Sequence, residues 1–194
     1  MTRLFVLARH GESTLNAARI VNGDPEVEVR LTETGRRESQ LLGDQLQNLP
    51  LDLCVVTRFG RTRETAEIAV AGREVPFEVE PLFDDVDIGD LEGESIEEYR
   101  AWKHAHERSD AFPGGESLDD AAARYARALE SLVARPQRAI LVVAHEIPVR
   151  YALNAAEGSD DPDSPHHVIA NATPYLFGEE RLAAAAAWLA RGPD

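Results

Sequence analysis

Cysteine is almost absent from this chain, and long apolar runs are missing altogether. The only cysteine among the 194 residues, Cys54, lies inside an apolar stretch and is expected in the core, so disulfide bonds and cysteine-based zinc sites are excluded. No stretch approaches the ~20 apolar residues that a membrane helix needs, and the first apolar run is too short for a signal peptide. We therefore expect a cytoplasmic protein without a membrane partner.

Basic residues are also scarce. The chain has 20 Lys and Arg residues against 35 Asp and Glu residues, which gives a formal net charge of -15 at pH 7. Such an excess of negative charge argues against a protein that binds nucleic acid. It also makes any local cluster of arginine and histidine informative, because that cluster stands against the overall charge.

Strand and helix patterns alternate along the chain. A length of 194 residues suits a single domain over residues 1–194 with a sizeable core. Short apolar, β-branched runs predict strands, and apolar stripes at helical spacing behind Thr32, Ser95 and Ser117 predict capped helices. The alternation indicates an α/β fold with a mainly parallel sheet. The predicted strands are residues 4–8, 53–57, 77–80 and 139–144, and the predicted helices are residues 33–48, 62–70, the segment after Ser95, and 118–134.

Three of the predicted strands are followed by cationic side chains or by histidine. Arg9 and His10 follow the first, Arg58 and Arg61 follow the second, and His145 follows the last. The carboxyl ends of parallel strands share one edge of a sheet, where ligands of α/β proteins bind. Arginine suits a phosphate because its planar fork donates two parallel hydrogen bonds. The sequence therefore predicts a phosphate pocket in which a neutral histidine is a candidate nucleophile.

Further residues near these strand ends fit such a pocket. Gly11 allows the backbone to approach a ligand closely, and Asn16 offers a neutral amide donor. A leaving alkoxide needs a proton, which one of Asp84, Asp85 and Asp87 is placed to supply, because crowded carboxyl groups raise one another's pKa.

Each of these residues also has an ordinary explanation when it is taken singly. A histidine is often structural, Arg61 suits a solvated helix start, Asn16 suits a turn cap, and an acidic run suits an exposed loop. Because all of these residues lie near the ends of the predicted strands, a shared phosphate site is favoured over these separate explanations. His166 and His167 have no carboxylate or cysteine at ligand spacing, so we expect them on the surface and expect no metal site.

The chain resembles the histidine phosphatase superfamily, which includes the cofactor-dependent phosphoglycerate mutases. The similar segments span nearly the whole chain in the family's order. They are Leu7 to Asn16 (LARHGESTLN), Leu31-Thr32 with Gly35, Arg61 with Thr65-Ala66, Ile88 to Gly93 (IGDLEG), Pro113 to Ser117 (PGGES), Val142 to His145 (VVAH), and Asn171-Ala172.

This resemblance implies roles for the residues at the strand ends. His10 would be the nucleophile that becomes phosphohistidine. The proton donor would be Asp85, which stands four residues before the family's glycine. The phosphoryl group would be bound by Arg9, Asn16, Arg61 and His145.

The resemblance also sharpens the expected fold. It implies a three-layer sandwich, with a central and mostly parallel sheet flanked by helices. It further implies a last strand at residues 180–190, although the alanine-rich sequence there has strong helix propensity. Following the resemblance, we predict a strand.

The chain departs from the family pattern at three places. Aspartate stands at position 85, where the family often has glutamate. Glu146 replaces the glycine that usually follows the second histidine, and its carboxylate at the substrate-binding edge would repel an anion unless it turns away or pairs with Arg150. The paired arginines that hold the substrate carboxylate in the mutases are missing, because the corresponding segment has only Lys103 and Arg108.

The resulting hypothesis is a metal-independent phosphomonoester hydrolase without a cofactor. It would act as a histidine acid-type phosphatase on a small phosphorylated metabolite, with Tyr99 and Trp102 either facing that substrate or packing in the wall behind it. The alternatives are a phosphoglycerate mutase and, as a non-enzyme, a pseudoenzyme that binds phosphoryl ligands, which the unusual Asp85 and Glu146 suggest. The residues indicate neither the physiological ester nor an oligomeric state.

Overall fold

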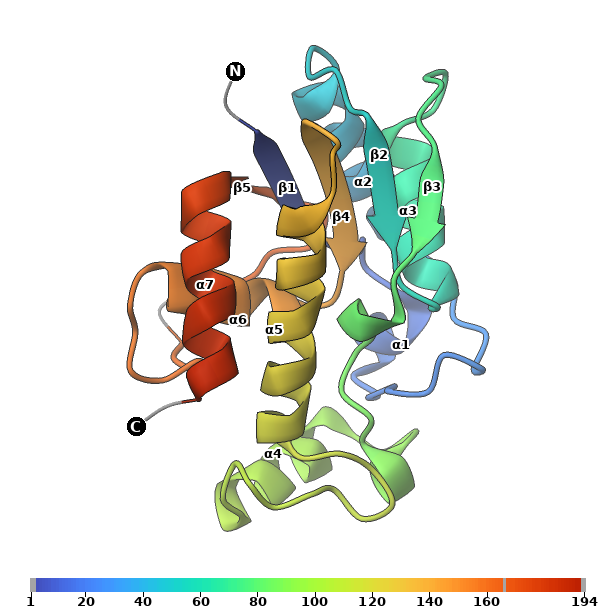
Figure 1. Ribbon diagram of the computed structural model, residues 1–194. Helices are drawn as coiled ribbons and strands as arrows, with labels where there is room; N and C mark the ends of the chain where they lie inside the picture. Colours follow the sequence, from blue (N-terminus) through green and yellow to red (C-terminus); the bar gives the residue numbers. More distant parts are fainter. Residues whose placement is uncertain (1–2, 166, 193–194) are drawn as a thin grey trace.

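A five-stranded sheet in the order β3-β2-β4-β1-β5 forms the centre of the computed structural model, which describes residues 3–165 and 167–192 (Figure 1). The first four strands in this order run parallel, and β5 runs antiparallel to β1. The mostly parallel sheet expected from the sequence is therefore confirmed. The strands are β1 (Leu4–Arg9), β2 (Leu53–Val56), β3 (Phe77–Val79), β4 (Ala139–Ala144) and β5 (Pro174–Gly178).

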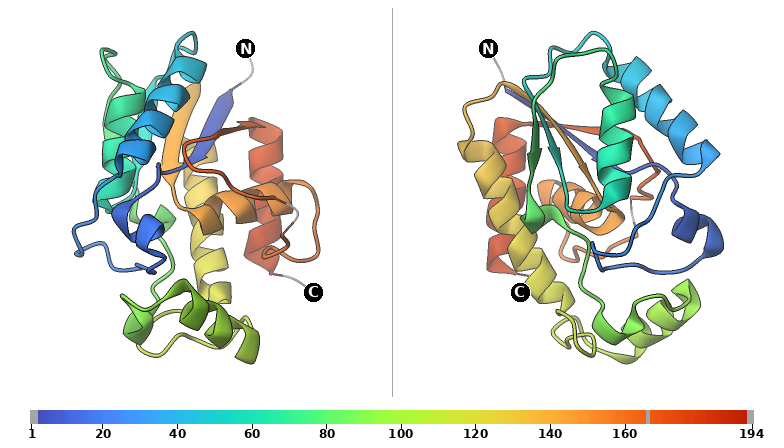
Figure 2. Two further views of the ribbon diagram at one scale, coloured as in Figure 1. Left: turned by 180° about the vertical axis from the view of Figure 1, so that it is seen from behind. Right: turned by 90° about the vertical axis from the view of Figure 1, so that its right-hand side faces the viewer.

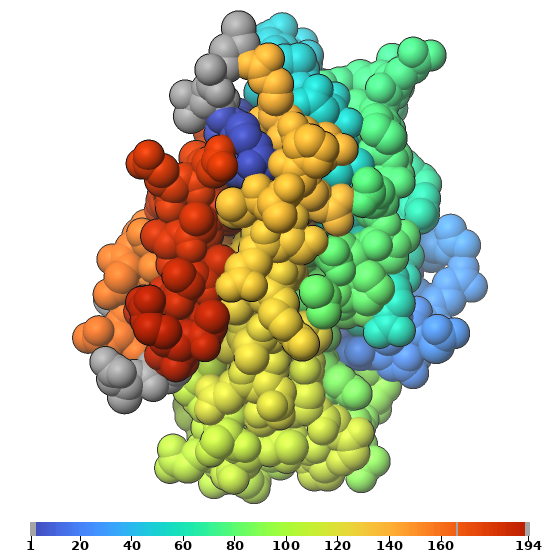
Figure 3. Space-filling view, in the orientation of Figure 1, coloured from blue at the N-terminus to red at the C-terminus, as the bar shows by residue number. Residues whose placement is uncertain are grey.

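Helices cover both faces of the sheet, which makes the three layers visible when the sheet is seen edge-on (Figure 2). Helices α2 and α3 pack on each other on one face, and α5, α6 and α7 contact one another on the other. Helix α4 and the loops around it lie beyond the end of the sheet, at the bottom of Figure 1, and in the space-filling view this part is continuous with the rest of the molecule (Figure 3). The helices are α1 (Thr14–Ala18), α2 (Glu33–Leu46), α3 (Gly60–Ala69), α4 (Ile96–Ala105), α5 (Leu118–Ala134), α6 (Glu146–Ala156) and α7 (Glu179–Arg191), with short 3-10 turns at Pro81–Phe83 and Gly89–Leu91.

The strands divide the apolar core into two parts. Phe5 and Leu7 of β1 point to the side of α5, α6 and α7, whereas Val6 and Ala8 point to the side of α2 and α3. This alternation follows from the two-residue repeat of a strand, and both faces are apolar because helices bury both. Cys54 of β2 is fully buried, as expected from its apolar neighbours.

The prediction of a strand at residues 180–190 is wrong. Those residues form α7, in which a stripe of side chains at helical spacing is buried: Leu182, Ala185, Ala186 and Leu189. The high helix propensity of alanine and this buried stripe both favour a helix over a strand in the alanine-rich segment. The last strand is β5, directly before the helix, and Gly178 serves as the N-cap of α7.

Helix α5 begins at a capping box. Ser117 Oγ accepts a hydrogen bond from the backbone N–H of Asp120, whose side chain in turn accepts from the Ser117 backbone N–H. Replacing Ser117 with alanine removes one partner of a buried helix start. We expect the free energy of unfolding to fall by about 1 kcal/mol in urea denaturation, with enzymatic properties unchanged.

Candidate active site

The residues that follow β1, β2 and β4 meet at one edge of the sheet. The strand register pairs Arg9 with Ala144 and Val56 with Val143, so the next residues along each strand, His10, Thr57 and His145, lie near one another. The ring centroids of His10 and His145 are 5.4 Å apart. The clustering expected from the three strand ends is therefore present in the structure.

His10 is buried with its tautomer defined by its neighbours. Its Nδ1 lies 2.7 Å from the carbonyl oxygen of Gly11, which can only accept, so Nδ1 carries the proton. Its Nε2 accepts from Arg61 Nε at 3.0 Å. Burial, together with the charges of Arg61 and Arg9, holds the pKa of His10 well below its ordinary value. His10 is therefore a neutral imidazole whose Nε2 lone pair lies beside a cation.

Arg61 connects the site residues from the first turn of α3. Its Nη1 donates to Asn22 Oδ1, and its Nη2 lies 3.2 Å from His145 Nδ1 and 3.4 Å from Asp85 Oδ2. The guanidinium also lies over the Phe59 ring, 4.3 Å from its centroid. Burial lowers the pKa of Arg61, and the charge of Asp85 opposes that shift. Arg58, by contrast, turns away from this cluster and pairs with Asp84.

His145 is fully buried at the N-cap of α6. Its Nε2 lies 3.0 Å from Thr57 Oγ1, and its Nδ1 faces Arg61 and Asp85. The pKa of His145 lies well below its ordinary value, mainly because the ring is buried and secondly because of the charge of Arg61.

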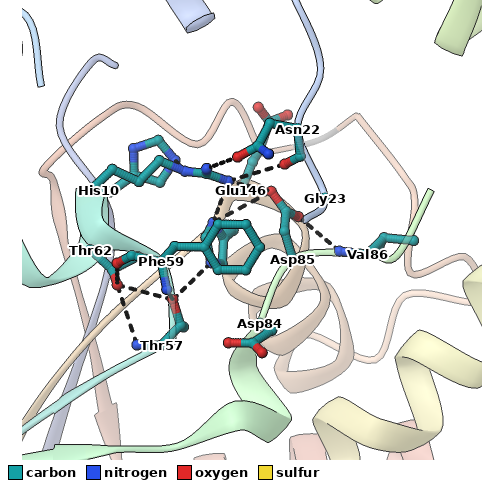
Figure 4. Close-up of polar contacts among 12 residues, drawn as sticks. His10, Asn22, Gly23, Thr57, Phe59, Thr62, Asp84, Asp85, Val86 and Glu146 are labelled. Atoms are coloured by element: carbon teal, nitrogen blue, oxygen red, sulfur yellow. Dashed lines mark hydrogen bonds and ion pairs between the residues drawn. The ribbon is translucent and has the colours of Figure 1, made fainter. Parts of the chain in front are cut away.

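The three acids of the 84–87 segment occupy different positions. Asp85 extends toward Arg61 and His145, whereas Asp84 points away from the cluster (Figure 4). Asp87 accepts from the backbone N–H of Gly89 and is exposed. Burial raises the pKa of Asp85 above its ordinary value, which Arg61 partly counteracts. Only Asp85 of the three therefore combines a position in the cluster with a proton held more firmly than usual.

Helix α5 holds the backbone of this segment. Arg124 donates to the carbonyl oxygens of Leu82 at 2.9 Å, Asp84 at 3.0 Å and Asp85 at 3.2 Å. The Tyr125 hydroxyl donates to the Asp84 carbonyl oxygen at 3.1 Å.

Glu146 forms ion pairs with two arginines. Its Oε2 lies 2.8 Å from Arg9 Nη1, and its Oε1 accepts from Arg150 Nη2. Of the two alternatives that the sequence left for Glu146, the structure shows the pairing with Arg150, and Arg9 is a second partner. The Nε atoms of Arg9 and Arg150 are buried without a hydrogen-bond partner in the described part of the chain. Buried donors without acceptors are unfavourable, and an anion bound beside them would remove that penalty.

Gly11 and Asn16 are both engaged in local structure. The Gly11 N–H donates to Thr65 Oγ1, and a Cβ at this glycine would lie 2.4 Å from the carbonyl oxygen of Gly35, so the missing side chain allows α2 to approach. Asn16 Oδ1 accepts from the Ser13 N–H in the capping box of α1. Asn16 also lines the cavity described next, so its cap role and a ligand role are compatible.

The cluster opens into a cavity of about 530 Å³. Helix α4 supplies part of its wall through Tyr99, Arg100 and Lys103, and of the two aromatic residues considered for this wall, Tyr99 is the one that lines the cavity. Burial and the neighbouring arginines lower the pKa of Lys103 to about 8. Trp102 is not among the described lining residues and instead packs on Phe112, with ring centroids 4.2 Å apart.

Sequence reasoning did not identify Asn22 or Thr57 as site residues. Asn22 lies in a segment that reads only as a loop, and it reaches Arg61 because Gly23 lets that loop approach Val86, whose carbonyl oxygen would be 2.2 Å from a Cβ. Thr57 ends a strand pattern and carries no chemical signature of its own. Of the two histidines expected on the surface, His167 pairs with Glu157 at 2.8 Å, and His166 lies outside the described residues.

Neither a metal site nor a membrane helix is found in residues 3–165 and 167–192. No group of three or more His, Cys, Asp or Glu side chains there is placed to hold a metal ion. Within the same ranges, every helix is too short or too polar to cross a membrane.

Comparisons with known proteins agree with this geometry. The family model described as "Histidine phosphatase superfamily (branch 1)" matches residues 5–184. A 2,3-bisphosphoglycerate-dependent phosphoglycerate mutase of Methylobacterium sp. is 30% identical over 178 residues, which cover 81% of this chain and 82% of the relative. The uncharacterized phosphatase PhoE of Bacillus subtilis is 28% identical over 155 residues, covering 79% and 77%. The solved structure of Bacillus stearothermophilus YhfR matches 89% of each chain with a TM-score of 0.79 and 28% identity.

Proposed function

This chain belongs to the histidine phosphatase superfamily (branch 1), and from that premise we propose that it hydrolyses phosphate monoesters through a phosphohistidine at His10. The observation that carries the proposal is the state of His10, a neutral imidazole that lines the cavity and whose unprotonated Nε2 accepts a hydrogen bond from Arg61 Nε. A neutral imidazole attacks phosphorus when its lone pair is aimed and the phosphoryl charge is countered.

Two half-reactions follow from this arrangement. Nε2 of His10 forms a bond to phosphorus while the bond from phosphorus to the ester oxygen breaks, and the Asp85 carboxyl group gives its proton to that leaving oxygen. Water then attacks the phosphohistidine, and the Asp85 carboxylate takes a proton from the water. Inorganic phosphate leaves, and the His10 lone pair is restored. Arg9, Arg61 and His145 stabilise the phosphoryl charge throughout.

The charged side chains that line the whole cavity bear on the substrate class. Its lining includes five cationic side chains, from Arg9, Arg61, Arg100, Lys103 and Arg150, against three carboxylates, from Asp85, Glu146 and Asp163. A positive cavity in a chain of net charge -15 favours small anions locally. We therefore propose a small phosphorylated metabolite as substrate.

A second candidate function is phosphoglycerate mutase. Arg100, Lys103 and Arg150 lie on the cavity wall and suit a substrate carboxylate, although the paired arginines of the mutases are missing. A mutase would keep the phosphohistidine long enough to pass the phosphoryl group back to the product. Hydrolysis and isomerisation are therefore distinguished by the fate of the same intermediate.

A panel of phosphate esters separates the candidates. The purified protein is incubated without added metal with p-nitrophenyl phosphate, an uncharged sugar phosphate, a phosphoglycerate and a sugar bisphosphate, and both free phosphate and isomerised product are followed by 31P NMR. The proposal expects phosphate release to exceed isomerisation for every ester. Faster isomerisation of the phosphoglycerate would establish the mutase instead. Absence of turnover combined with measurable phosphate binding would leave a phosphoryl-binding pseudoenzyme.

Asp85 provides a prediction about pH dependence. Because burial raises its pKa, the carboxyl group stays protonated to a higher pH than usual, and hydrolysis of an alkyl phosphate should fall as the pH rises through that pKa. Asp85→Asn should lower kcat/KM for alkyl phosphates, which reports the steps up to release of the alcohol, by about 10²–10⁴-fold and remove this alkaline limb. The loss should be much smaller for p-nitrophenyl phosphate, whose leaving group needs no proton. Equal losses for both esters would contradict the role of proton donor.

A further inference from the structure

Two threonines behind His145 form a buried chain that the reaction above does not use. Thr57, just after β2, and Thr62 of α3 are 2% and 0% exposed, and we call them the threonine pair. Their Oγ1 atoms are 2.9 Å apart, Thr57 Oγ1 lies 3.0 Å from His145 Nε2, and Thr62 Oγ1 lies 2.8 Å from the Phe59 carbonyl oxygen. Figure 4 shows the contacts of the pair around Phe59.

The donor and acceptor of each hydrogen bond between Phe59 and His145 can be assigned by starting from the Phe59 carbonyl oxygen. The Phe59 carbonyl oxygen can only accept, so the single hydroxyl proton of Thr62 is used there. Thr62 Oγ1 must then accept from the Thr57 hydroxyl, which uses the single hydroxyl proton of Thr57. Thr57 Oγ1 is left as an acceptor toward His145. The donor in the last contact is therefore His145 Nε2–H.

We infer that the threonine pair fixes neutral His145 as the Nε2–H tautomer, so that Nδ1 is the atom that takes up a proton when a phosphoryl group binds. Nδ1 faces Arg61 Nη2 at 3.2 Å and Asp85 Oδ2 at 3.4 Å, and these two residues line the cavity, whereas His145 itself is fully buried behind them. Thr57 and Thr62 are positioning residues, since they act only through His145. The catalytic consequence rests on the proposed function, whereas the tautomer does not.

The tautomer of His145 determines which ring nitrogen takes up a proton when a phosphate dianion binds. His145 takes up one proton from solvent at Nδ1, and the new Nδ1–H donates to a phosphoryl oxygen while Nε2–H stays on Thr57. With the opposite tautomer, the proton would have to be taken up at Nε2, away from the ligand and facing a buried hydroxyl. The charged and titratable groups around His145 that also affect this uptake are Arg61, Asp85, His10, Arg9 and Arg124.

The tautomer is measured directly by 15N NMR of the histidine side chains in the full-length protein, with the His145 resonances assigned. Wild type is expected to show a protonated Nε2 and a bare Nδ1. Thr62→Ala frees the Thr57 hydroxyl to donate, so part or all of His145 is expected to move to the Nδ1–H tautomer without any change in residues that touch the ring. Thr57→Val removes the hydroxyl group and should also change the tautomer of His145. Thr57→Ser keeps the hydroxyl group and should show the wild-type tautomer.

The same variants test the consequence for phosphate. Thr62→Ala and Thr57→Val should lower kcat by roughly tenfold and alter its pH profile, because the loss of one buried hydrogen bond has an effect of that size. Ser117→Ala is the matched control, because it also removes a buried hydroxyl group but one that takes no part in the hydrogen bonds to His145. It should keep the wild-type pH profile of kcat.

Three results would overturn the inference. They are a wild-type His145 that carries its proton on Nδ1, an unchanged tautomer in folded Thr62→Ala, and an unchanged pH profile of kcat in both variants despite a shifted tautomer. If no ester is hydrolysed, the proposed function fails, but the NMR spectrum still decides the tautomer. Circular dichroism identifies a variant that fails to fold, and the wild-type spectrum alone is then sufficient to support or refute the assignment.

Discussion

His10→Gln should abolish phosphate release, with a loss in kcat of at least about 10⁴-fold, because it removes the atom that forms the bond to phosphorus. The amide is similar in size to imidazole and keeps a polar group beside Arg61, so the fold should be unaffected. Rapid quenching of wild type with a 32P-labelled ester should trap an acid-labile phosphoenzyme, which the variant should lack.

The chain offers a matched control for this experiment. His167 is a half-buried histidine paired with Glu157 outside the cavity, and His167→Gln should keep both turnover and phosphoenzyme. Phosphoenzyme that persists in His10→Gln would show that another residue is the nucleophile, and His145, 5.4 Å away between ring centroids, would be the next to test.

Arg61→Gln should have the second largest effect, a decrease in kcat of roughly 10³–10⁵-fold. Arg61 contacts both histidines and Asp85 at once, so its removal takes away transition-state charge stabilisation and the alignment of His10. Arg61→Lys keeps the charge but lacks the planar fork, so it should recover only part of the activity. Steady-state kinetics with p-nitrophenyl phosphate measures both variants.

Arg63 supplies the control on the same helix. It lies two residues further along α3 and pairs with Glu67 on the surface, so Arg63→Gln should leave kcat and KM close to wild type. If Arg61→Gln raised KM alone and kept kcat, Arg61 would contribute uniform binding of ground state and transition state, and its proposed catalytic role would be incorrect.

Those features of the site that depend on regular structure could be predicted from sequence. Strong apolar runs predict β1, β2 and β4, and parallel pairing brings the residues after them to one edge, as the register of Arg9 with Ala144 shows. The placement of His10 and His145 follows from these facts alone, whereas the choice of Arg61 over Arg58 needed the family resemblance. The choice of Asp85 among three acids needed the family resemblance, because the loop that carries them has no periodic pattern.

Other features depend on tertiary contacts that no local pattern contains. Asn22 reaches Arg61 because two loops pack closely at Gly23, and Thr57 contacts His145 across neighbouring strand ends. The error at residues 180–190 has the opposite origin, since local propensity correctly indicated a helix and the family expectation of a strand overrode it. The strand that pairs with β1 lies just before that segment.

The hold of α5 on the acidic segment explains how a short side chain can replace the glutamate that is usual in the family. Aspartate has one rotatable bond fewer, so the position of its carboxyl group depends more on where its backbone lies. Arg124 and Tyr125 fix that backbone through hydrogen bonds to the carbonyl oxygens of Leu82, Asp84 and Asp85. Asp85, the proposed proton donor, belongs to a loop, but its backbone is thereby held by a 17-residue helix.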